Sequence, residues 1–552
     1  MINLAVASQA LSGTVLPASN VSFKENSCLC GQGIDRWAYV GLKAEANFWK
    51  AQHGRAVVRE GELKAKLEQK EAELRLLKQK YYGKSKESRK KSEKLGSNLD
   101  GKQRKRGQQK GSKGHPRRPQ NLPVIEELIE LPPNQQCCAT CNLPYVALST
   151  TEDSELIEIY VKGYIRKIKR KKYKRHVNCQ CEGTQQVITT PAISKIINKG
   201  KLGVSIWANL LVNKFSDYIP TYRSIGGLEN YGISLAQGTI TDGFKKLAPL
   251  FEPVKHTMIE KSQKEKHWHA DETRWEVFEH VEGKATHRWY LWIFQSASVA
   301  VYVLDPSRGS SVPEEFFKDV GEGIISCDRY TVYKKVVKKK ILLILAFCWA
   351  HVRRDFLDVA KSYPKQENWA VDWIKDIGNI YHLNKNRLKH PVDSHQFKEE
   401  HLKLEAAIKA MEKKCIDQLS MPNLHDACRS RLESLQNHWS GLIIFVEHSE
   451  IPMDNNTTEN GLRGPVVGRK CFYGSGSIWA AHLAATMFSI FKTLRMWNIN
   501  LITWVCLYLE ECANNNGNPP EDISQFIPWS MNDAQLNKMS LPMPCPPILD
   551  TS

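Results

Sequence analysis

Hydrophobic and polar positions divide the chain into segments with different periodicities. From about Leu42 to Tyr82 the sequence is rich in Ala, Glu, Lys and Leu, and leucines recur on one face of a helix. They are Leu63, Leu67, Leu74 and Leu77, spaced 4, 7 and 3 residues apart. This spacing predicts a short coiled coil and a homo-oligomer, although Lys70 interrupts it and the same stripe could pack on the rest of the chain.

The pattern changes to short alternating runs between Val124 and Gly183. A Cys-x-x-Cys pair lies near the start of this region, and a Cys-x-Cys pair follows an alternating run from Ile165 to Val177, which predicts a strand. Four thiolates from two turns can hold a tetrahedral zinc ion and let a small zinc-ribbon-like module fold. The predicted structural Zn²⁺ ligands are Cys138, Cys141, Cys179 and Cys181, and His176 or Cys137 could replace one of them.

Residues 192–247 follow a helical pattern, with a Tyr-Gly break before a second helix that begins at Ser234. A short helix, a glycine turn and a second helix fit a helix-turn-helix DNA reader. Small helical bundles use the same pattern for packing alone, so both interpretations stay open.

Three β-rich runs then follow each other closely and predict an antiparallel meander. The first carries Asp271, a further strand ends at Asp328, and a long, mainly helical segment from Asp355 to His448 separates them from Glu459. Glu459 lies where Pro452, Asp454 and Asn455 suit the start of a helix, and Arg463 shares its face. The order of strand, strand and helix is typical of a ribonuclease-H-like domain.

These three acids suggest one chemistry. Two Mg²⁺ ions about 4 Å apart stabilise both the attacking and the leaving oxygen of an in-line displacement at phosphorus, and hard cations require oxygen ligands. Asp271, Asp328 and Glu459 supply such ligands, so we predict that they form one catalytic site for two Mg²⁺ or Mn²⁺ ions. Taken singly, each acid could equally be an ordinary strand-end, turn or helix-terminus residue.

Charge and length support a multidomain protein with a polyanionic partner. The 552 residues exceed the ~250 to 300 that one core accommodates. The net charge of +19 is concentrated in Lys84–Arg118 and Lys162–Arg175, and a merely solvated surface would not explain this clustering. Candidate nucleic-acid contacts in these segments are Lys105, Arg106, Arg117, Arg118, Lys171 and Lys172.

The sequence shows few signals for secretion or membrane insertion. The 15 cysteines lack the dense spacing of a secreted scaffold, and residues 1–20 lack the basic leading segment of a signal peptide. The longest apolar run, Ile341–Ala350, is about half the ~20 residues needed to span a bilayer. We therefore expect a cytoplasmic protein without a membrane partner.

Longer motifs surround the three acids. They are His-Ala-Asp271-Glu-Thr, Cys-Asp328-Arg-Tyr, the stretch Cys348-Trp-Ala-His351-Val-Arg-Arg, and Asn-Thr-Thr-Glu459-Asn-Gly-Leu-Arg463-Gly-Pro-Val-Val-Gly-Arg469-Lys470. On these motifs the chain resembles the DDE transposases of insertion-sequence family sixty-six, specifically the large catalytic subunit, over about residues 42–530. The Cys-x-Cys spacing departs from the family pattern.

The resemblance implies that Asp271, Asp328 and Glu459 are the metal-binding triad of a bacterial, nucleoid-associated transposase. Its DNA partners would be terminal inverted repeats and target DNA, cleaved and joined with Mg²⁺, and accessory proteins of the same element would assist. Arg463, Arg469 and Lys470 would contact DNA near the site. Cys348 and His351 form a Cys-x-x-His pair whose role could be structural, since a Cys at the end of an apolar strand is usually core.

We therefore expect an α+β multidomain protein whose ribonuclease-H-like catalytic domain has a mixed sheet flanked by helices. The expected segments are 1–41 without assignment, 42–83 coiled coil, 84–120 basic flexible linker, 121–185 zinc-ribbon-like module, 186–262 helical region, 263–510 catalytic domain with a helical insertion at about 355–450, and 511–552 tail. A structure-selective nuclease on the same fold and a catalytically silent DNA-binding relic are the alternative functions.

Overall fold

A computed structural model gives the fold. It describes residues 36–82, isolated positions between 128 and 145, and residues 161–543 except 175, 177–180, 183–184, 284–285 and 341. The chain divides into two compact units, 1–86 and 87–552.

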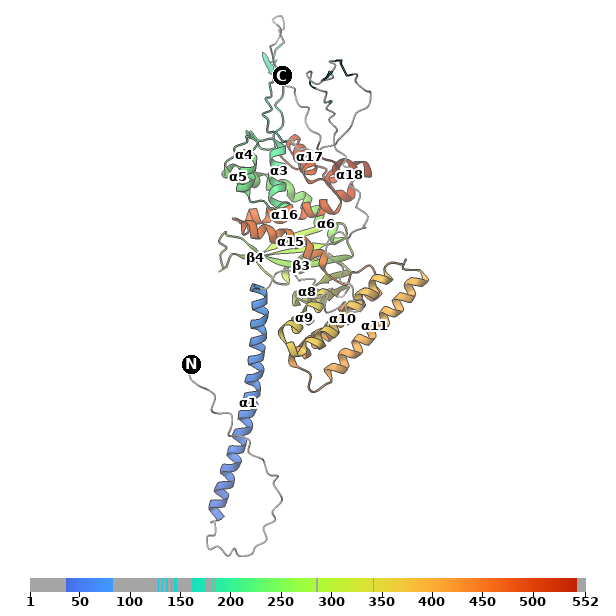
Figure 1. Ribbon diagram of the computed structural model, residues 1–552. Coiled ribbons are helices and arrows are strands. Elements are labelled where there is room, and N and C mark those ends of the chain that lie inside the picture. Colours follow the sequence, from blue (N-terminus) through green and yellow to red (C-terminus); the bar gives the residue numbers. More distant parts are fainter. Residues whose placement is uncertain are drawn as a thin grey trace, which may run out of the picture. The chain divides into compact units, whose positions relative to one another are not determined.

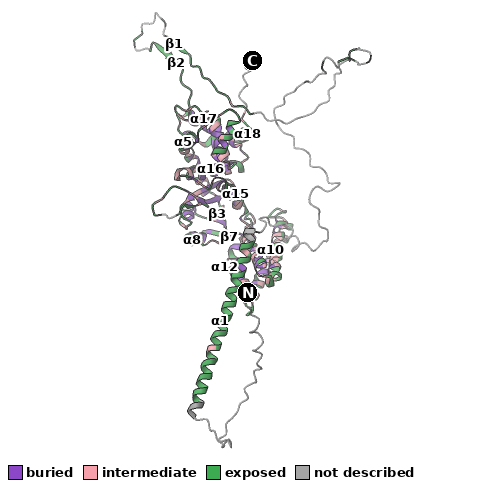
Figure 2. Cartoon of the chain, turned by 60° about the vertical axis from the view of Figure 1, so that its left-hand side comes forward, coloured by how far each residue is buried: buried purple, intermediate pink, exposed green. Residues whose placement is uncertain are grey.

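One helix, α1 (Arg36–Tyr82), makes up the described part of the first unit (Figure 1). The predicted helix is confirmed and begins earlier than Leu42. Ion pairs between successive turns, such as Lys64 with Glu60 at 2.6 Å, support it. Its side chains are mostly exposed (Figure 2), and the predicted stripe is among them, namely Leu63, Leu67, Leu74 and Leu77. Self-association through this stripe stays a prediction.

The second unit is built on a mixed five-stranded sheet in the order β5-β4-β3-β6-β7. The strands are β3 (His267–Glu276), β4 (Arg288–Gln295), β5 (Ala300–Asp305), β6 (Gly323–Cys327) and β7 (Leu343–Phe347). β3, β4 and β5 form the predicted antiparallel meander, whereas β6 pairs in parallel with β3 and β7. Helices α7 (Ser311–Phe316) and α8 (Thr331–Lys339) lie in the crossovers that parallel pairing requires.

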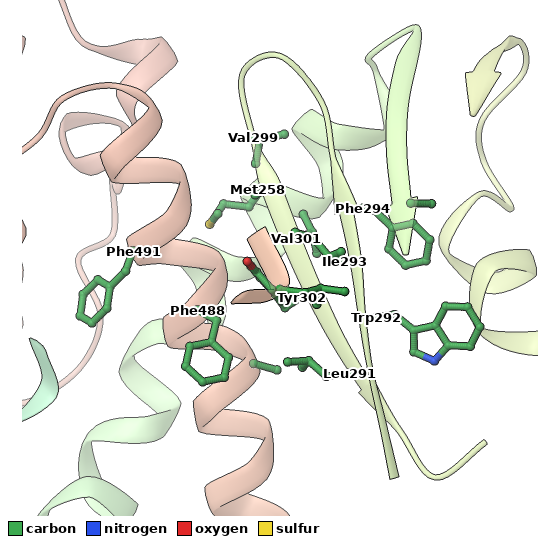
Figure 3. Close-up of a cluster of buried hydrophobic side chains, with 14 of the residues drawn as sticks. Met258, Leu291, Trp292, Ile293, Phe294, Val299, Val301, Tyr302, Phe488 and Phe491 are labelled. Carbon is green, nitrogen blue, oxygen red and sulfur yellow. The ribbon is translucent and has the colours of Figure 1, made fainter. Parts of the chain in front are cut away.

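Strand β4 is nearly all apolar because helices cover both faces of the sheet. Leu291 and Ile293 lie toward helix α16 (Ile478–Met496), which contributes Phe488 and Phe491 (Figure 3). The alternate residue Phe294 lies on the other face, where its ring stacks on Phe316 of α7 with centroids 4.0 Å apart. Burial on two faces thus fixes the strand register, since a one-residue slip would exchange the two sets of side chains.

Helices occupy the chain between β7 and Asn456. They are α9 (Trp349–Ser362), η3 (Pro364–Gln366), α10 (Glu367–Arg387), α11 (His395–Leu419), α12 (Asp426–Asn437), α13 (Trp439–Leu442) and α14 (Ile444–Glu447). Trp373, Ile377 and Ile380 of α10 are buried, whereas Ile374 and Tyr381 are half-buried. Helix α10 packs between α9 and α11 (Figure 1).

A further helical layer combines segments that precede β3 in the sequence with segments that follow residue 455. It contains α3 (Val204–Phe215), α4 (Thr221–Glu229), α5 (Gln237–Leu247), η2 (Ala248–Phe251), α6 (Glu252–Gln263), α15 (Asn456–Phe472), α16, α17 (Leu501–Asn514), η4 (Ser524–Phe526), η5 (Pro528–Ser530) and α18 (Asp533–Ser540). Helix α3 packs on α16 and α17, so much of its surface is core. DNA reading by the α4–α5 pair stays a prediction.

The cysteine region differs from expectation where it is described. The strand predicted from Ile165 to Val177 is wrong in extent, because only β1 (Lys172–Lys174) pairs, with β2 (Val187–Thr189). Ile165 is 88% exposed, so its alternation has no core to face. The predicted zinc ligands Cys138, Cys141 and Cys179 lie outside the described residues, and Cys181 is exposed. The zinc site therefore stays a prediction.

Among the described residues, no helix combines the length and apolar character that crossing a membrane requires.

Candidate active site

Parallel pairing of β3 with β6 brings two of the predicted acids to one edge of the sheet. His269 is the register partner of Ser326, and Asp271 and Asp328 each follow two residues later. Asp328 comes directly after β6, where its Oδ1 accepts a hydrogen bond from the backbone N–H of Tyr330 at 2.9 Å. This turn ends the strand and leads into α8.

Helix α15 carries the third acid, Glu459, in its first turn. The helix lies close on the sheet because Gly461 has no side chain: a Cβ there would lie 2.6 Å from Cδ1 of Ile293 on β4. The hydroxyl of Tyr302 on β5 also donates to the Gly461 carbonyl at 2.8 Å. These contacts fix the distance between α15, which carries Glu459, and the sheet.

Asn455, the residue before α15, connects the site's three elements. Its side-chain amide donates to the carbonyl of Ala270 at 2.8 Å, and its Oδ1 lies 2.8 Å from Nδ1 of His269, so it contacts two successive residues of β3. Its backbone N–H donates to Sγ of Cys348 at 3.2 Å, at the start of α9. With 1% exposure, Asn455 is a buried polar junction next to Asp271.

That contact differs from the helix-capping role that the sequence suggested. Asn455 is the N-cap residue by position, yet its side chain makes no capping hydrogen bond. The carboxylate of Asp454 instead accepts from the backbone N–H of Asn456 at 3.1 Å. The Asn455 amide is thereby available for β3, a partner about 186 residues away in sequence that no local pattern reveals.

Three other carboxylates act on the pKa of Asp271. The pKa of Asp271 is raised to about 7, most strongly by burial, next by the charge of the neighbouring Glu272, and less by the charges of Asp328 and Glu459. A backbone N–H of Glu272 donates to Asp271 at 2.9 Å and offsets part of this shift. Like charges held together raise a carboxyl pKa, and a bound cation would relieve their repulsion.

Sequence reasoning missed a fourth carboxylate, Glu272, whose side chain is 2% exposed. Arg308 donates to it from two nitrogens at 2.9 and 2.7 Å, and the hydroxyl of Tyr333 donates at 3.0 Å. Burial and the charge of Asp328 raise the Glu272 pKa, while Arg308 opposes the shift. The only available signal was its place beside Asp271 in the sequence.

Cys348 and His351 lie at the start of α9, beside the acids. Burial raises the pKa of the Cys348 thiol, whose sulfur accepts the Asn455 N–H, so this residue acts in packing and in fixing the α15 start. His351 Nε2 lies 4.0 Å from Glu459 Oε1, and Arg354 approaches the same oxygen at 3.6 Å. Burial lowers the pKa of His351, and the positive charge of Arg354 lowers it further.

The predicted DNA contacts occupy different settings. Arg463 and Lys470 are exposed on α15, and Lys171 and Lys172 are exposed at β1. Arg469 donates to the Arg274 carbonyl, so part of its hydrogen-bonding capacity holds α15 on β3. The remaining candidates, Lys105, Arg106, Arg117 and Arg118, lie outside the described residues.

The donor set fits a hard divalent cation in chemistry, because carboxylate oxygens are the ligands such ions prefer. Across the described residues, no group of three His, Cys, Asp or Glu side chains stands in ligating proximity as the side chains lie. Glu459 is turned toward Arg354 and His351, so binding a shared cation requires its carboxylate to rotate toward Asp271.

The fold and this cluster define an α+β protein with a carboxylate site at the edge of a mixed sheet. Residues 199–483 match the model of the Transposase IS66 family, and the chain belongs to this family. The resemblance drawn from the sequence motifs is thereby confirmed. Family membership implies DNA transposition and a DNA partner.

Relatives occur in Sinorhizobium fredii (strain NBRC 101917 / NGR234). The uncharacterized protein y4jD is 22% identical over 448 residues, covering 78% of this chain and 85% of its own length. The uncharacterized protein y4hP is 21% identical over 442 residues, covering 75% and 76% respectively. No solved structure matches the chain.

Replacing Asn455 with Ala should uncouple Glu459 from β3. The change leaves the Ala270 carbonyl and a His269 nitrogen without their partner, at a cost of ~1–3 kcal/mol for each buried group. We expect a lower free energy of unfolding, measured by chemical denaturation, together with a smaller increase in melting temperature on adding Mg²⁺.

Asn384→Ala is the matched control, because Asn384 is 6% exposed and accepts from Arg387 away from the acids. It should destabilise the protein but leave the Mg²⁺-dependent increase intact. An Asn455→Ala protein with the full Mg²⁺ response would contradict the positioning role.

Replacing Asp271 with Asn should stabilise the metal-free protein. Folded Asp271 takes up its proton at about pH 7, against ~3.9 when unfolded, so wild-type stability falls as pH rises through this window. Asn carries no charge and so removes the free-energy cost of ionising Asp271 in the folded protein, which is on the order of a few kcal/mol above pH 7. Melting temperatures from pH 4 to pH 8 should show the variant's advantage growing with pH.

Asp319→Asn, an exposed control, should show no such trend. A less stable Asp271→Asn protein at pH 8 would refute the electrostatic account.

Proposed function

We propose that the protein is a DDE transposase that binds the terminal inverted repeats of its own element, cleaves DNA at the element ends and joins them to target DNA. The observation that carries this proposal is the placement of three acids from distant segments at one sheet edge. They are Asp271 within β3, Asp328 after β6 and Glu459 in the first turn of α15. Membership of the transposase family supplies the DNA substrate class.

The strand order supports a ribonuclease-H-like catalytic domain. An antiparallel meander of three strands is extended by two parallel strands, with the first strand at the centre. Asp271 lies in the middle of β3, two residues past its pairing with β6, and Asp328 comes directly after β6; α15, which packs on β3, carries the third acid. This arrangement favours the assignment of Asp271, Asp328 and Glu459 as one catalytic unit.

In this proposal the three carboxylates hold two Mg²⁺ or Mn²⁺ ions. When bound, such a pair supplies Lewis acidity at the attacking and leaving oxygens of the phosphodiester. Asn455 fixes the start of α15, and so Glu459, relative to β3 and Asp271. Arg308 and Tyr333 hold the Glu272 carboxylate through hydrogen bonds. The raised pKa of Asp271 reflects a site whose negative charge a cation would compensate.

The reaction consists of two in-line displacements. A water oxygen attacks the phosphorus at the element end, the P–O3′ bond breaks, and the strand leaves as a free 3′-hydroxyl. That hydroxyl then attacks a target phosphodiester, so one P–O bond forms as another breaks and no covalent protein intermediate arises. Arg463 and Lys470, exposed on α15 beyond Glu459, would contact the phosphates on either side.

Other parts of the proposal concern segments around the catalytic domain. The basic residues of 84–120 would add sequence-independent affinity for DNA that weakens with salt, and the cysteine module would hold structural Zn²⁺. Self-association through α1, accessory proteins of the same element and a nucleoid location in the bacterial cytoplasm complete it.

Asp328→Asn is the most direct test of the catalytic unit. Because the amide keeps the shape but removes a charged ligand, we expect Mg²⁺-dependent cleavage of element-end DNA to fall by at least about a hundredfold. DNA binding in EDTA should remain unchanged. Cleavage by Asp328→Asn at the wild-type rate would contradict the proposal. Asp319→Asn, an exposed substitution of the same type, serves as the control.

Product analysis separates a transposase from a nuclease on the same fold. Labelled element-end DNA incubated with a target plasmid and Mg²⁺ should give products in which the label is covalently joined to the plasmid. Hydrolysed ends without joined products would favour the structure-selective nuclease. Failure of Mn²⁺ to bind at the acids would favour a catalytically silent DNA-binding relic.

A further inference from the structure

Helix α15 runs along β3 from the acids toward a hollow in the surface. Near the start of the helix Glu459 acts on Asp271, further along Arg469 donates to the Arg274 carbonyl, and after its end Ser475 bonds β3 at Glu276. The helix and the strand therefore run in the same direction from Asp271 to Glu276.

An open hollow of about 550 Å³ lies at the far end of this path. Its volume falls within the ~300–1,000 Å³ range of small-ligand sites. Two of its rings are strongly exposed, Phe278 at 47% and Tyr473 at 73%, and the His287 ring lies 5.8 Å from that of Phe278. The lining residues are Glu276, Phe278, Thr286, His287, Arg288 and Tyr473.

Backbone contacts hold these rings in place. Tyr473 ends α15 in the left-handed conformation with φ +63°, which a bulky residue rarely adopts. Gly474 follows so close to β3 that a Cβ would lie 2.2 Å from the Glu276 carbonyl oxygen. Ser475 then donates to Glu276 and accepts from Phe278, both at 2.9 Å. The segment Tyr473–Ser475 thus fixes the backbone of Tyr473 relative to that of Phe278.

The hollow lies a defined distance from the acids. The strand from Asp271 to Val277 spans about 20 Å at ~3.3 Å per residue. The helix from Glu459 to Tyr473 spans about 21 Å at ~1.5 Å per residue, which agrees. Exposed Arg463 and Lys470 lie between the two ends of α15. A DNA strand that starts at the acids would reach the hollow after about six nucleotides at ~3.4 Å each.

From this geometry we propose that the hollow formed by Phe278, His287, Arg288 and Tyr473 binds an unpaired deoxynucleotide of the DNA strand that leads away from the acids. The proposal rests on the proposed function for the direction of the DNA. Aromatic rings stack on the faces of bases, which duplex DNA keeps covered, and nearby cations bind the phosphates. Among the lining residues, exposed Arg288 supplies positive charge beside the rings, opposite in sign to Glu276.

Binding of single-stranded DNA without catalysis tests this site. Full-length protein in EDTA and raised salt is titrated into fluorescently labelled oligothymidine and into a duplex of equal length, with anisotropy as the readout. EDTA excludes cleavage, so the result stands apart from the proposed strand chemistry, and salt suppresses sequence-independent phosphate binding.

Tyr473→Asn removes the ring but tolerates the left-handed backbone, and Phe278→Ala removes the second ring. Each should weaken single-strand binding by roughly tenfold, as loss of one stacked base implies, with little change for the duplex. Tyr473→Phe should bind like wild type, and so should Leu402→Ala, an equally exposed apolar change on α11. Melting temperatures verify that all variants fold.

Unchanged single-strand affinity in both ring variants would overturn the proposal, and so would equal losses for single strand and duplex, which would indicate phosphate contacts alone. A second readout uses oligonucleotides with 5-iododeoxyuridine, which form photo-crosslinks to stacked aromatic residues. We expect the adduct on Tyr473 or Phe278, and adducts confined to other residues would contradict the site.

Discussion

The site depends on one buried asparagine. Asn455 holds the peptide after Ala270 on β3 with its side chain and the sulfur of Cys348 with its backbone, so the strand, α9 and α15 meet at one residue. Because a buried polar group must find partners, this junction has few alternative arrangements. The position of Glu459 relative to Asp271 depends on it, whereas Asp328 is placed by the pairing of β6 with β3.

The repulsion between these carboxylates opposes stability. Asp271 is half-buried and the Glu272 side chain is 2% exposed; both have raised pKa values, and Asp328 acts electrostatically on each. Such clustering costs free energy in the absence of a compensating cation, and Arg308 compensates only Glu272. The rest of the fold offsets this cost with a sheet whose two faces are covered, as the buried residues of β4 illustrate. Perturbed carboxyls on a stable scaffold are typical of catalytic sites.

Local patterns predicted those parts of the molecule that depend on periodicity. The meander, the helical character of α1 and the strand placement of Asp271 and Asp328 follow from runs of apolar residues that burial makes necessary. Ile165–Val177 has the same alternation, yet among its described residues only Lys172–Lys174 pair as a strand, because alternation alone provides no sheet to join. Glu272 and Asn455 escaped prediction for another reason: their roles depend on partners, Arg308 and His269, that are distant in sequence.

The central claim is that Asp271, Asp328 and Glu459 hold cations together, and anomalous diffraction from crystals soaked with Mn²⁺ tests it most directly. The account predicts anomalous peaks between these carboxylates, with the Glu459 side chain rotated away from Arg354 toward Asp271. An ordered active site without manganese density at the three acids, or density held by other residues alone, would contradict it.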